Sequence, residues 1–302
     1  MPGQGSTYIG NLYTWLRTGK RFRPSFPRAI QLQTQSTCNA RCIFCPHCQY
    51  PSDIIHGKMD IWLFRKIVDE CAKHYVSRIS PYLTNEPLMD KRISDMISYI
   101  THKKKICTRT KINTNGSLLA AEMSHALLDA GLDQLWISVN GYTPESYNKA
   151  MQLDISTVLN NIDHFLFLKE KLKKKCKVVI TTINTSIVAS ELDYAKAYWS
   201  KRDVKFNIHS LDNRAGGNIE NLLPENIRPI PKRNCDLFLK QAYIVENGDM
   251  ILCCHDWRQS VKIGNVAETS IYDVWNSQRF KELIWEYYEG RYENLKICET
   301  CA

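Results

Sequence analysis

The stretch Cys38-Asn39-Ala40-Arg41-Cys42-Ile43-Phe44-Cys45 places three thiols within eight residues, at the spacing C-x3-C-x2-C. It follows residues 29–34, an alternating apolar and polar run that predicts a first strand. Three thiolates can hold three irons of a four-iron cluster and leave the fourth iron without a protein ligand. An iron with a free position can bind and activate a small molecule, as a catalytic zinc ion with an open position does.

This spacing, with aromatic Phe44 just before the third cysteine, resembles the signature of the radical S-adenosylmethionine (radical SAM) superfamily. The resemblance implies a 4Fe–4S cluster whose open iron chelates the amino and carboxylate groups of SAM. One electron from that cluster then cleaves SAM to a 5′-deoxyadenosyl radical. A zinc knuckle is the alternative, with His47 or Cys48 as its fourth ligand. The metal ligands expected from the resemblance are Cys38, Cys42 and Cys45, with Phe44 counted among the cofactor-binding residues.

The whole chain has 302 residues, of which 44% are hydrophobic, and this fits one large α/β domain with at most a small appendage. The formal charge of +9 gathers in residues 169–177, with smaller clusters at 17–23 and 103–105. The first cluster ends a long amphipathic stretch, where cations favour a helix C-terminus. A solvated helix end is therefore the main interpretation, and a phosphorylated substrate or nucleic acid is the alternative. No RNA-binding fingerprint supports nucleic acid as a partner.

The cysteine usage and the N-terminus bear on location. Twelve cysteines occur without a basic-then-apolar signal peptide, which predicts a reducing cytoplasm and metal ligation before disulfides. No apolar run approaches the ~18 residues that span a bilayer, so no membrane association is expected.

Predicted strands and helices alternate along the first two thirds of the chain. Strands are expected at 29–34, 78–83, 110–113, 133–139, 177–183 and 204–208, and helices at 61–75, 89–101, 118–130, 157–174 and 192–199, with Gly131 closing the third helix. A short helix at 8–17 precedes them. Six such units predict an α/β fold with a parallel sheet, and the radical SAM core is a six-unit (β/α)6 partial TIM barrel. We divide the chain into a lead-in (1–28), the partial barrel (29–210), a linker or active-site loop (211–234) and an extension (235–302).

Polar residues follow the predicted strands where a ligand site of an α/β fold is built. Thr84-Asn85-Glu86-Pro87 lies where the superfamily usually has Gly-Gly-Glu, so Glu86 is expected to meet the amino group of SAM. Turn formation is the alternative for each residue, because Asn-Gly pairs end strands in many folds. The further SAM contacts that the resemblance implies are Asn115, Ser138, Asn140 and Asn184.

A second cysteine group lies after the barrel. Its spacing resembles the auxiliary-cluster extension called SPASM, and more closely its short form, the twitch domain, which holds one extra 4Fe–4S cluster. Asn247-Gly248 between residues 243–245 and 250–252 predicts a hairpin, and 271–288 a single helix. Cys254 is left without a role, and a structural zinc site is the alternative. The expected cluster ligands are Cys235, Cys253, Cys298 and Cys301.

A closed auxiliary cluster favours oxidation of a small alcohol or amine, because that cluster can accept the electron left after hydrogen abstraction. The compact length and thiol spacing are similar to those of the aminocyclitol dehydrogenase of butirosin biosynthesis. His209, Asp212 and Arg214, just past the last barrel strand, are candidates for proton removal or substrate contact.

Two alternatives stay open. One is peptide modification by epimerisation, thioether formation or crosslinking, although the 37 residues before Cys38 are expected to be too few for a leader-binding domain. The other is a zinc-binding interaction protein without catalysis. A radical SAM enzyme would further need a reducing partner such as flavodoxin or ferredoxin.

Overall fold

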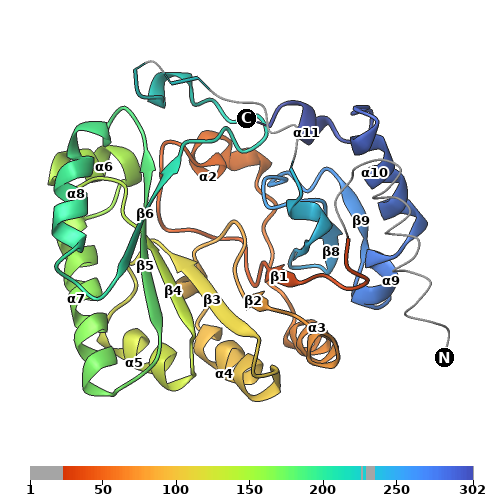
Figure 1. Ribbon diagram of the computed structural model, residues 1–302, viewed down its shortest axis with the longest axis horizontal. Coiled ribbons are helices and arrows are strands. Elements are labelled where there is room, and N and C mark those ends of the chain that lie inside the picture. Colours follow the sequence, from red (N-terminus) through yellow and green to blue (C-terminus); the bar gives the residue numbers. More distant parts are fainter. Residues whose placement is uncertain (1–22, 226, 229–234, 302) are drawn as a thin grey trace.

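Six parallel strands form a curved sheet in the computed structural model, which describes residues 23–225, 227–228 and 235–301 (Figure 1). Their order is β6-β5-β4-β3-β2-β1. The predicted helix at 8–17 lies outside the described residues. The strands are β1 (Ala29–Leu32), β2 (Arg78–Ser80), β3 (Arg109–Thr114), β4 (Gln134–Ser138), β5 (Lys177–Asn184) and β6 (Lys205–Ser210).

Helices cover the convex face of this sheet, as alternating units require (Figure 1). They are α3 (Ile61–Lys73), α4 (Ile93–Lys103), α5 (Ala121–Asp129), α6 (Pro144–Met151), α7 (Ile155–Lys171) and α8 (Leu192–Trp199). The six-unit partial barrel expected from the sequence is confirmed.

Several boundaries differ from the expected ones for local reasons. The predicted helix 89–101 begins only at Ile93, because residues 87–89 form a 3-10 turn and Asp90 accepts hydrogen bonds from Arg92. Helix α7 begins two residues early, because the Asp154 side chain caps the amides of Ser156 and Thr157. Helix α6 was not predicted, although Thr143 caps it in a capping box with Ser146.

Gly131 follows helix α5 as predicted. Its φ of +80° is a conformation that a residue with a Cβ rarely adopts. An added Cβ would also lie 2.9 Å from the Thr101 side chain of the neighbouring helix. The glycine therefore ends α5 and allows the chain to turn into β4.

The chain beyond residue 235 adds three strands to the same sheet. Strand β7 (Gln241–Ile244) pairs parallel with β1, with Ala29 opposite Gln241 and Leu32 opposite Ile244. Strand β8 (Asp249–Ile251) pairs antiparallel with β7, which confirms the predicted hairpin around Gly248. An unpredicted strand, β9 (Lys262–Asn265), completes a nine-stranded sheet. The division of the chain at 211–234 stays a prediction.

The single helix predicted at 271–288 is wrong. Two helices, α9 (Ile271–Trp275) and α10 (Gln278–Tyr288), meet at Ser277, whose hydroxyl caps α10 by accepting from the Phe280 amide at 3.2 Å. Local capping outweighs the continuous apolar periodicity here. Helix α11 (Lys296–Glu299) follows and carries Cys298.

The last residues before β1 pack on this C-terminal part. The Trp275 indole donates to the Pro24 carbonyl at 2.9 Å, and the Asn276 amide donates to the Ser25 carbonyl at 3.0 Å. The Arg23 guanidinium stacks over the Trp275 ring, 4.8 Å from its centroid. Among the helices that the structure describes, none is long and apolar enough to cross a membrane.

Candidate active site

The cysteine loop lies directly after β1, at the carboxyl edge of the parallel strands (Figure 1). The Ile43 amide donates to the Ala150 carbonyl at 3.1 Å, so helix α6 holds the loop. The Cys45 amide donates to the Cys42 carbonyl at 2.9 Å, and this turn leads into the short helix α2 (Pro46–Gln49). The residues from Cys42 to Cys45 therefore form a compact turn that keeps these two thiols close together.

The three thiols of this loop are close enough to act on one another electrostatically. Burial raises the pKa of the Cys38 thiol to about 12, and the charge of Cys45 adds to that rise. Burial, followed by the charges of Cys45 and Cys38, raises the pKa of Cys42. Such thiols stay protonated at neutral pH unless a bound metal displaces the proton, so the donor set fits an iron–sulfur cluster.

Glu86 ties two strand ends together beside this loop. Its carboxylate is 2% exposed and accepts hydrogen bonds from the Thr114 hydroxyl at 2.6 Å and the Asn115 amide at 2.7 Å. The Leu88 amide donates to it as well, at 3.1 Å. Burial raises the pKa of Glu86 to about 7 although these three donors lower it. The carboxylate therefore already binds this chain's own donors, and its contact with SAM stays a prediction.

Asn115 joins the next strand end to the cysteine loop. Its side-chain amide donates to the Asn39 side chain at 2.9 Å and hydrogen-bonds the Cys38 thiol. Asn39 in turn donates to the Ser117 hydroxyl at 2.9 Å. These hydrogen bonds hold the turn after β3 against the cysteine loop, and the contact of Asn115 with SAM stays a prediction.

The other predicted SAM contacts divide into two kinds. Ser138 and Phe44 line a cavity at the same edge of the sheet. Asn140 is 2% exposed, accepts from the Ile183 amide at 2.8 Å and contacts the Met151 sulfur at 3.5 Å. The Asn184 side-chain oxygen is buried without a partner among the described residues. Asn140 thus holds β5 beside α6, while Asn184 retains an acceptor for a ligand.

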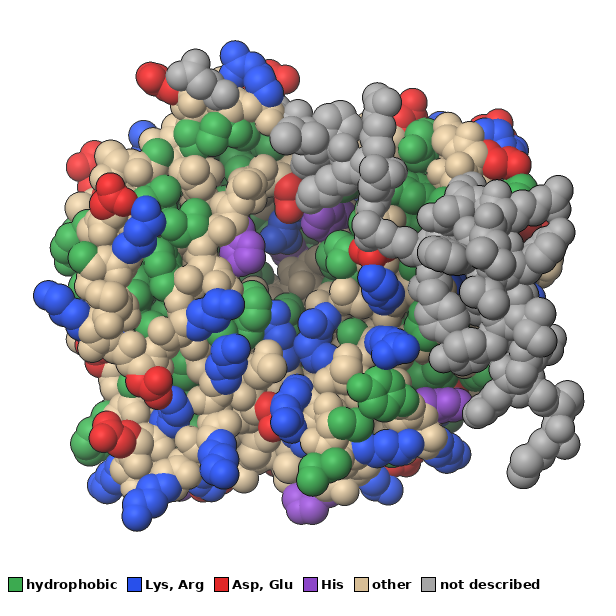
Figure 2. Space-filling view, in the orientation of Figure 1, with side chains coloured by type: hydrophobic (Ala, Val, Ile, Leu, Met, Phe, Trp, Pro, Cys, Tyr) green, Lys and Arg blue, Asp and Glu red, His purple; other side chains and the backbone are tan. Residues whose placement is uncertain are grey.

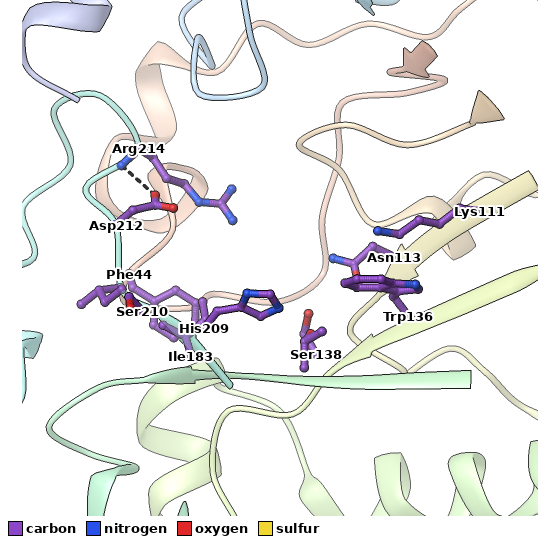
Figure 3. Close-up of a pocket in the computed structure, with 12 residues that line it drawn as sticks. Phe44, Lys111, Asn113, Trp136, Ser138, Ile183, His209, Ser210, Asp212 and Arg214 are labelled. Atoms are coloured by element: carbon purple, nitrogen blue, oxygen red, sulfur yellow. Dashed lines mark hydrogen bonds between the residues drawn. The ribbon is translucent and has the colours of Figure 1, made fainter. Parts of the chain in front are cut away.

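The cavity has a volume of about 320 Å³ and opens inside the curved sheet (Figure 3). His209 at the end of β6, and Asp212 and Arg214 just past it, are among the residues that line the cavity. Figure 2 shows this face hollowed near its centre, with Lys, Arg and His side chains gathered around the hollow. A cavity of this size suits a small molecule.

Sequence reasoning missed several residues of the cavity wall, among them Lys111, Asn113 and Trp136. They lie on β3 and β4, and Figure 3 shows them across the open space from Arg214. The sequence of β3 carries a pattern that could have identified two of them. Lys111 and Asn113 alternate with Ile112 and Thr114, which are buried on the other face of the strand. Such alternation in a strand of a parallel barrel indicates a polar interior.

The C-terminal cysteines converge from three segments. The Cys235 amide donates to the Tyr287 hydroxyl at 2.8 Å, and the His255 amide donates to the Cys253 sulfur at 3.4 Å. The His255 ring lies 3.5 Å from the Cys301 sulfur. Burial raises the pKa of Cys298 to about 12, and the charges of Cys235 and Cys301 add to the rise. Thiols from distant positions in the sequence thus lie near enough to act on one another electrostatically.

Cys254 lies close to Arg214 and Tyr243. Burial raises its pKa, while the nearby Arg214 guanidinium and a hydrogen bond with the Tyr243 hydroxyl lower it. Burial, followed by the charge of Cys254 and then that of Cys298, raises the pKa of Cys253. Cys298 thus acts on Cys253, and the choice of Cys253 as the cluster ligand stays a prediction.

A segment of the linker lies between the two cysteine groups. Burial alone would lower the pKa of Arg214, but the charges of Cys45, Asp212, Cys254 and Cys42 raise it above its usual value. The Asp212 carboxylate accepts from the Arg214 amide at 3.1 Å and lies 3.7 Å from the His255 ring. Residues 212–214 therefore contact the surroundings of both groups and the cavity at once.

Within the described residues, no three His, Cys, Asp or Glu side chains converge tightly enough to hold one metal ion. A 4Fe–4S cluster makes a different demand, because each thiolate binds a different iron and the thiolates stand further apart. Within each group the thiols are close enough for their charges to act on one another, which is compatible with that demand.

The chain matches two families of known proteins. Residues 32–186 match the family model of the radical SAM superfamily, and residues 235–302 match the iron–sulfur cluster-binding domain called SPASM. The S-adenosyl-L-methionine-dependent 2-deoxy-scyllo-inosamine dehydrogenase of Niallia circulans is 22% identical over 275 residues, covering 90% of this chain and 91% of the relative.

Solved structures show the same fold. BtrN in complex with AdoMet and 2-DOIA superposes with a TM-score of 0.60 at 21% identity, covering 91% of this chain and 92% of that one. SuiB of Streptococcus suis bound to S-adenosylmethionine superposes with a TM-score of 0.64 at 13% identity, covering 92% and 72%.

Proposed function

Because this chain belongs to the radical SAM superfamily and ends in a SPASM match, we propose that it oxidises a small hydroxyl- or amine-bearing substrate by two electrons. A cluster held by the N-terminal loop, together with SAM, would supply the 5′-deoxyadenosyl radical needed for hydrogen abstraction, and a cluster held by the C-terminal thiols would supply an acceptor for the remaining electron. The metal ligands in this proposal are Cys38, Cys42 and Cys45 for the first cluster, and Cys235, Cys253, Cys298 and Cys301 for the second.

One observation carries the proposal: Asp212 and Arg214 line the cavity, and both lie near residues of the two cysteine groups. A substrate in that cavity is near the loop that holds SAM and near the second group. The dehydrogenase relative, which covers nearly the whole chain, supports the same reaction class.

Oxidation to a carbonyl also requires that the substrate lose a proton. His209 and Asp212 stand on the cavity wall and are the proposed acceptors. The Arg214 amide holds the Asp212 carboxylate in place, and the Arg214 side chain points into the cavity (Figure 3). We propose that Arg214 orients the substrate oxygen, because a guanidinium offers several donors in one plane.

Anaerobic reconstitution tests the proposal. We expect a brown protein with about eight irons per chain, reduced by flavodoxin or ferredoxin in a cytoplasmic setting, that converts SAM to 5′-deoxyadenosine. A colourless protein that holds zinc and leaves SAM intact would falsify the enzyme reading. The second step offers 2-deoxy-scyllo-inosamine and related polyols and traps the carbonyl product by hydrazone formation.

Peptide modification is separated by a deuterium experiment. In D2O, oxidation to a carbonyl leaves no new deuterium on the reacting carbon. Epimerisation of a peptide instead returns a hydrogen atom to that carbon and incorporates solvent deuterium when the donor is an exchangeable thiol. Deuterium at the reacting carbon, without net oxidation, rules out the proposed dehydrogenation.

A further inference from the structure

The floor of the cavity carries a cation without a counter-ion. Lys111 lies on β3, three residues before that strand ends at Thr114. Its ammonium sits 3.4 Å from the centroid of the Trp136 ring and 6.0 Å from that of Tyr82. Across the described residues no carboxylate forms an ion pair with it, and the charge acting on it is that of Arg78. Burial, followed by Arg78, lowers the pKa of Lys111 to about 7.

The rest of the wall does not neutralise this charge. Asp212 is the carboxylate among the cavity-lining residues, and it stands beside the Arg214 amide on the opposite wall (Figure 3). The Asn113 side-chain oxygen, next to Lys111 on the same strand face, is buried without a partner among the described residues. Buried polar groups in proteins are almost always paired. At the cavity floor, therefore, the Lys111 ammonium has no carboxylate partner and the Asn113 side-chain oxygen has no hydrogen-bond donor among the described residues.

A stacking contact with Trp136 does not account for the lysine. A cation–π contact contributes about 0.5–2 kcal/mol, whereas taking an ammonium out of water costs several kcal/mol unless it is paired. Arg78 adds repulsion rather than relief. An anion bound in the cavity would offset both the desolvation of the Lys111 ammonium and its repulsion from Arg78, because charge-assisted hydrogen bonds are stronger than neutral ones.

We propose that the substrate of this enzyme is a hydroxylated small molecule with an oxyanion, a phosphate ester or a carboxylate, which Lys111 binds at the cavity floor. The inference rests on the proposed oxidation and names its substrate class. Three residues of strand place Lys111 about 10 Å below the strand ends, so a short carbon skeleton bound there extends its hydroxyl toward the cysteine loop. A free amine at the floor is excluded by repulsion from Lys111 and Arg78.

Binding to the reconstituted, SAM-loaded enzyme tests this without a known substrate. The probes are glucose 6-phosphate, gluconate, glucose and glucosamine, each titrated calorimetrically at pH 7.5. We expect one or both anions to bind about tenfold or more tightly than glucose, and glucosamine to bind most weakly. The two anion arms separate a phosphate ester from a carboxylate. Equal affinity for all four probes, or no binding of either anion, overturns the proposal.

Two variants locate the effect. Lys111→Met keeps the length of the side chain and removes the charge, so the preference for the anion over glucose should fall about tenfold or more. Lys177→Met removes an exposed lysine at the start of β5 and should change nothing. Unchanged anion affinity in Lys111→Met overturns the proposal. So does a loss of SAM affinity instead, since Lys111 would then serve the SAM carboxylate.

Proton uptake provides a readout that needs no variant. Free Lys111 is partly neutral at pH 7.5, because its pKa is lowered to about 7. A bound anion favours the charged form, so binding takes up protons. Titration in two buffers of different ionisation enthalpy measures this uptake, and its absence contradicts the assignment. Failure of these binding tests in an enzyme that still cleaves SAM refutes the oxyanion alone, whereas absence of SAM cleavage refutes the proposed function.

Discussion

The two cysteine groups of this protein are built in opposite ways. The first takes three thiols from one turn of eight residues after β1, while the second takes four thiols from segments around Cys235, Cys253 and α11. Three ligands leave one iron of a cluster open to a small molecule, and four ligands close it. The difference separates the part of the molecule that binds SAM from the part that is suited to electron transfer.

One sheet holds both groups at a fixed separation. Strand β7, which leads into the second group, pairs directly with β1, which leads into the first. The C-terminal extension is therefore a continuation of the barrel's sheet and not a separate unit beside it. The predictions below test whether the two groups differ in role as they differ in construction.

The largest effect is expected from the first group. Cys42→Ala should lower 5′-deoxyadenosine formation by about 100-fold or more, because even changes outside the ligand shell of a metal site cost about 10–100-fold. The measurement is 5′-deoxyadenosine released per enzyme under dithionite. Cys48→Ala is the matched control in the same loop and should retain activity. An equal loss in Cys48→Ala would mean that the fourth iron is capped, and the contrast with the second group would disappear.

The second group should behave differently. Cys298→Ala is expected to lose about four irons per chain and to abolish substrate oxidation while some SAM cleavage remains. Cys254→Ala, which removes the neighbouring thiol that faces Arg214, should keep both the iron and the cleavage. Equal loss of both activities in Cys298→Ala would show that the second group mainly supports the fold.

A smaller effect is expected at Glu86, which joins the strand ends next to the first group. Glu86→Gln places an amide opposite three donors, and a donor left unpaired costs about 1–3 kcal/mol. We expect the melting temperature to fall by several degrees and SAM affinity to fall about tenfold. Glu246→Gln is the control, a buried carboxylate that accepts from Gln33 at 2.9 Å. A melting temperature that falls no further in Glu86→Gln than in the control contradicts the strand-joining role.

The smallest effect concerns the support of the second group. Tyr287→Phe removes the hydroxyl that accepts the Cys235 amide, which should cost about 1 kcal/mol and lower the melting temperature by about 2–4 °C. Tyr292→Phe changes a neighbouring ring and should have less effect, because its hydroxyl has no hydrogen bond among the described residues. Chemical denaturation of the reconstituted proteins measures both. A loss of equal size in the two variants argues against the Cys235 contact.

The parts of the site that could be predicted are those carried by neighbouring residues. Three cysteines at fixed spacing predict a cluster loop, because ligands that share one turn come together whatever the remaining chain does. Gly131 and the Asn247-Gly248 turn were predicted for the same reason, since backbone conformation is a local property. The six alternating units followed from periodicity over many residues.

The parts that could not be predicted depend on contacts between distant residues. Asn140 was expected to contact SAM, and only the structure shows that its side-chain oxygen accepts from the Ile183 amide of β5. Lys111 looked like an ordinary strand lysine, and its isolation from every carboxylate of the described residues is a property of the closed cavity. The pairing of β7 with β1 joins segments more than 200 residues apart, which no local pattern encodes.

The sequence by itself determined the superfamily, the alternating architecture and the first set of thiols, because each depends on spacing along the chain. The tertiary structure alone decided which side chains surround Cys254, and which charges surround the cavity. Burial and partners, the quantities that set the chemistry of a side chain, arise only when separate segments share one space.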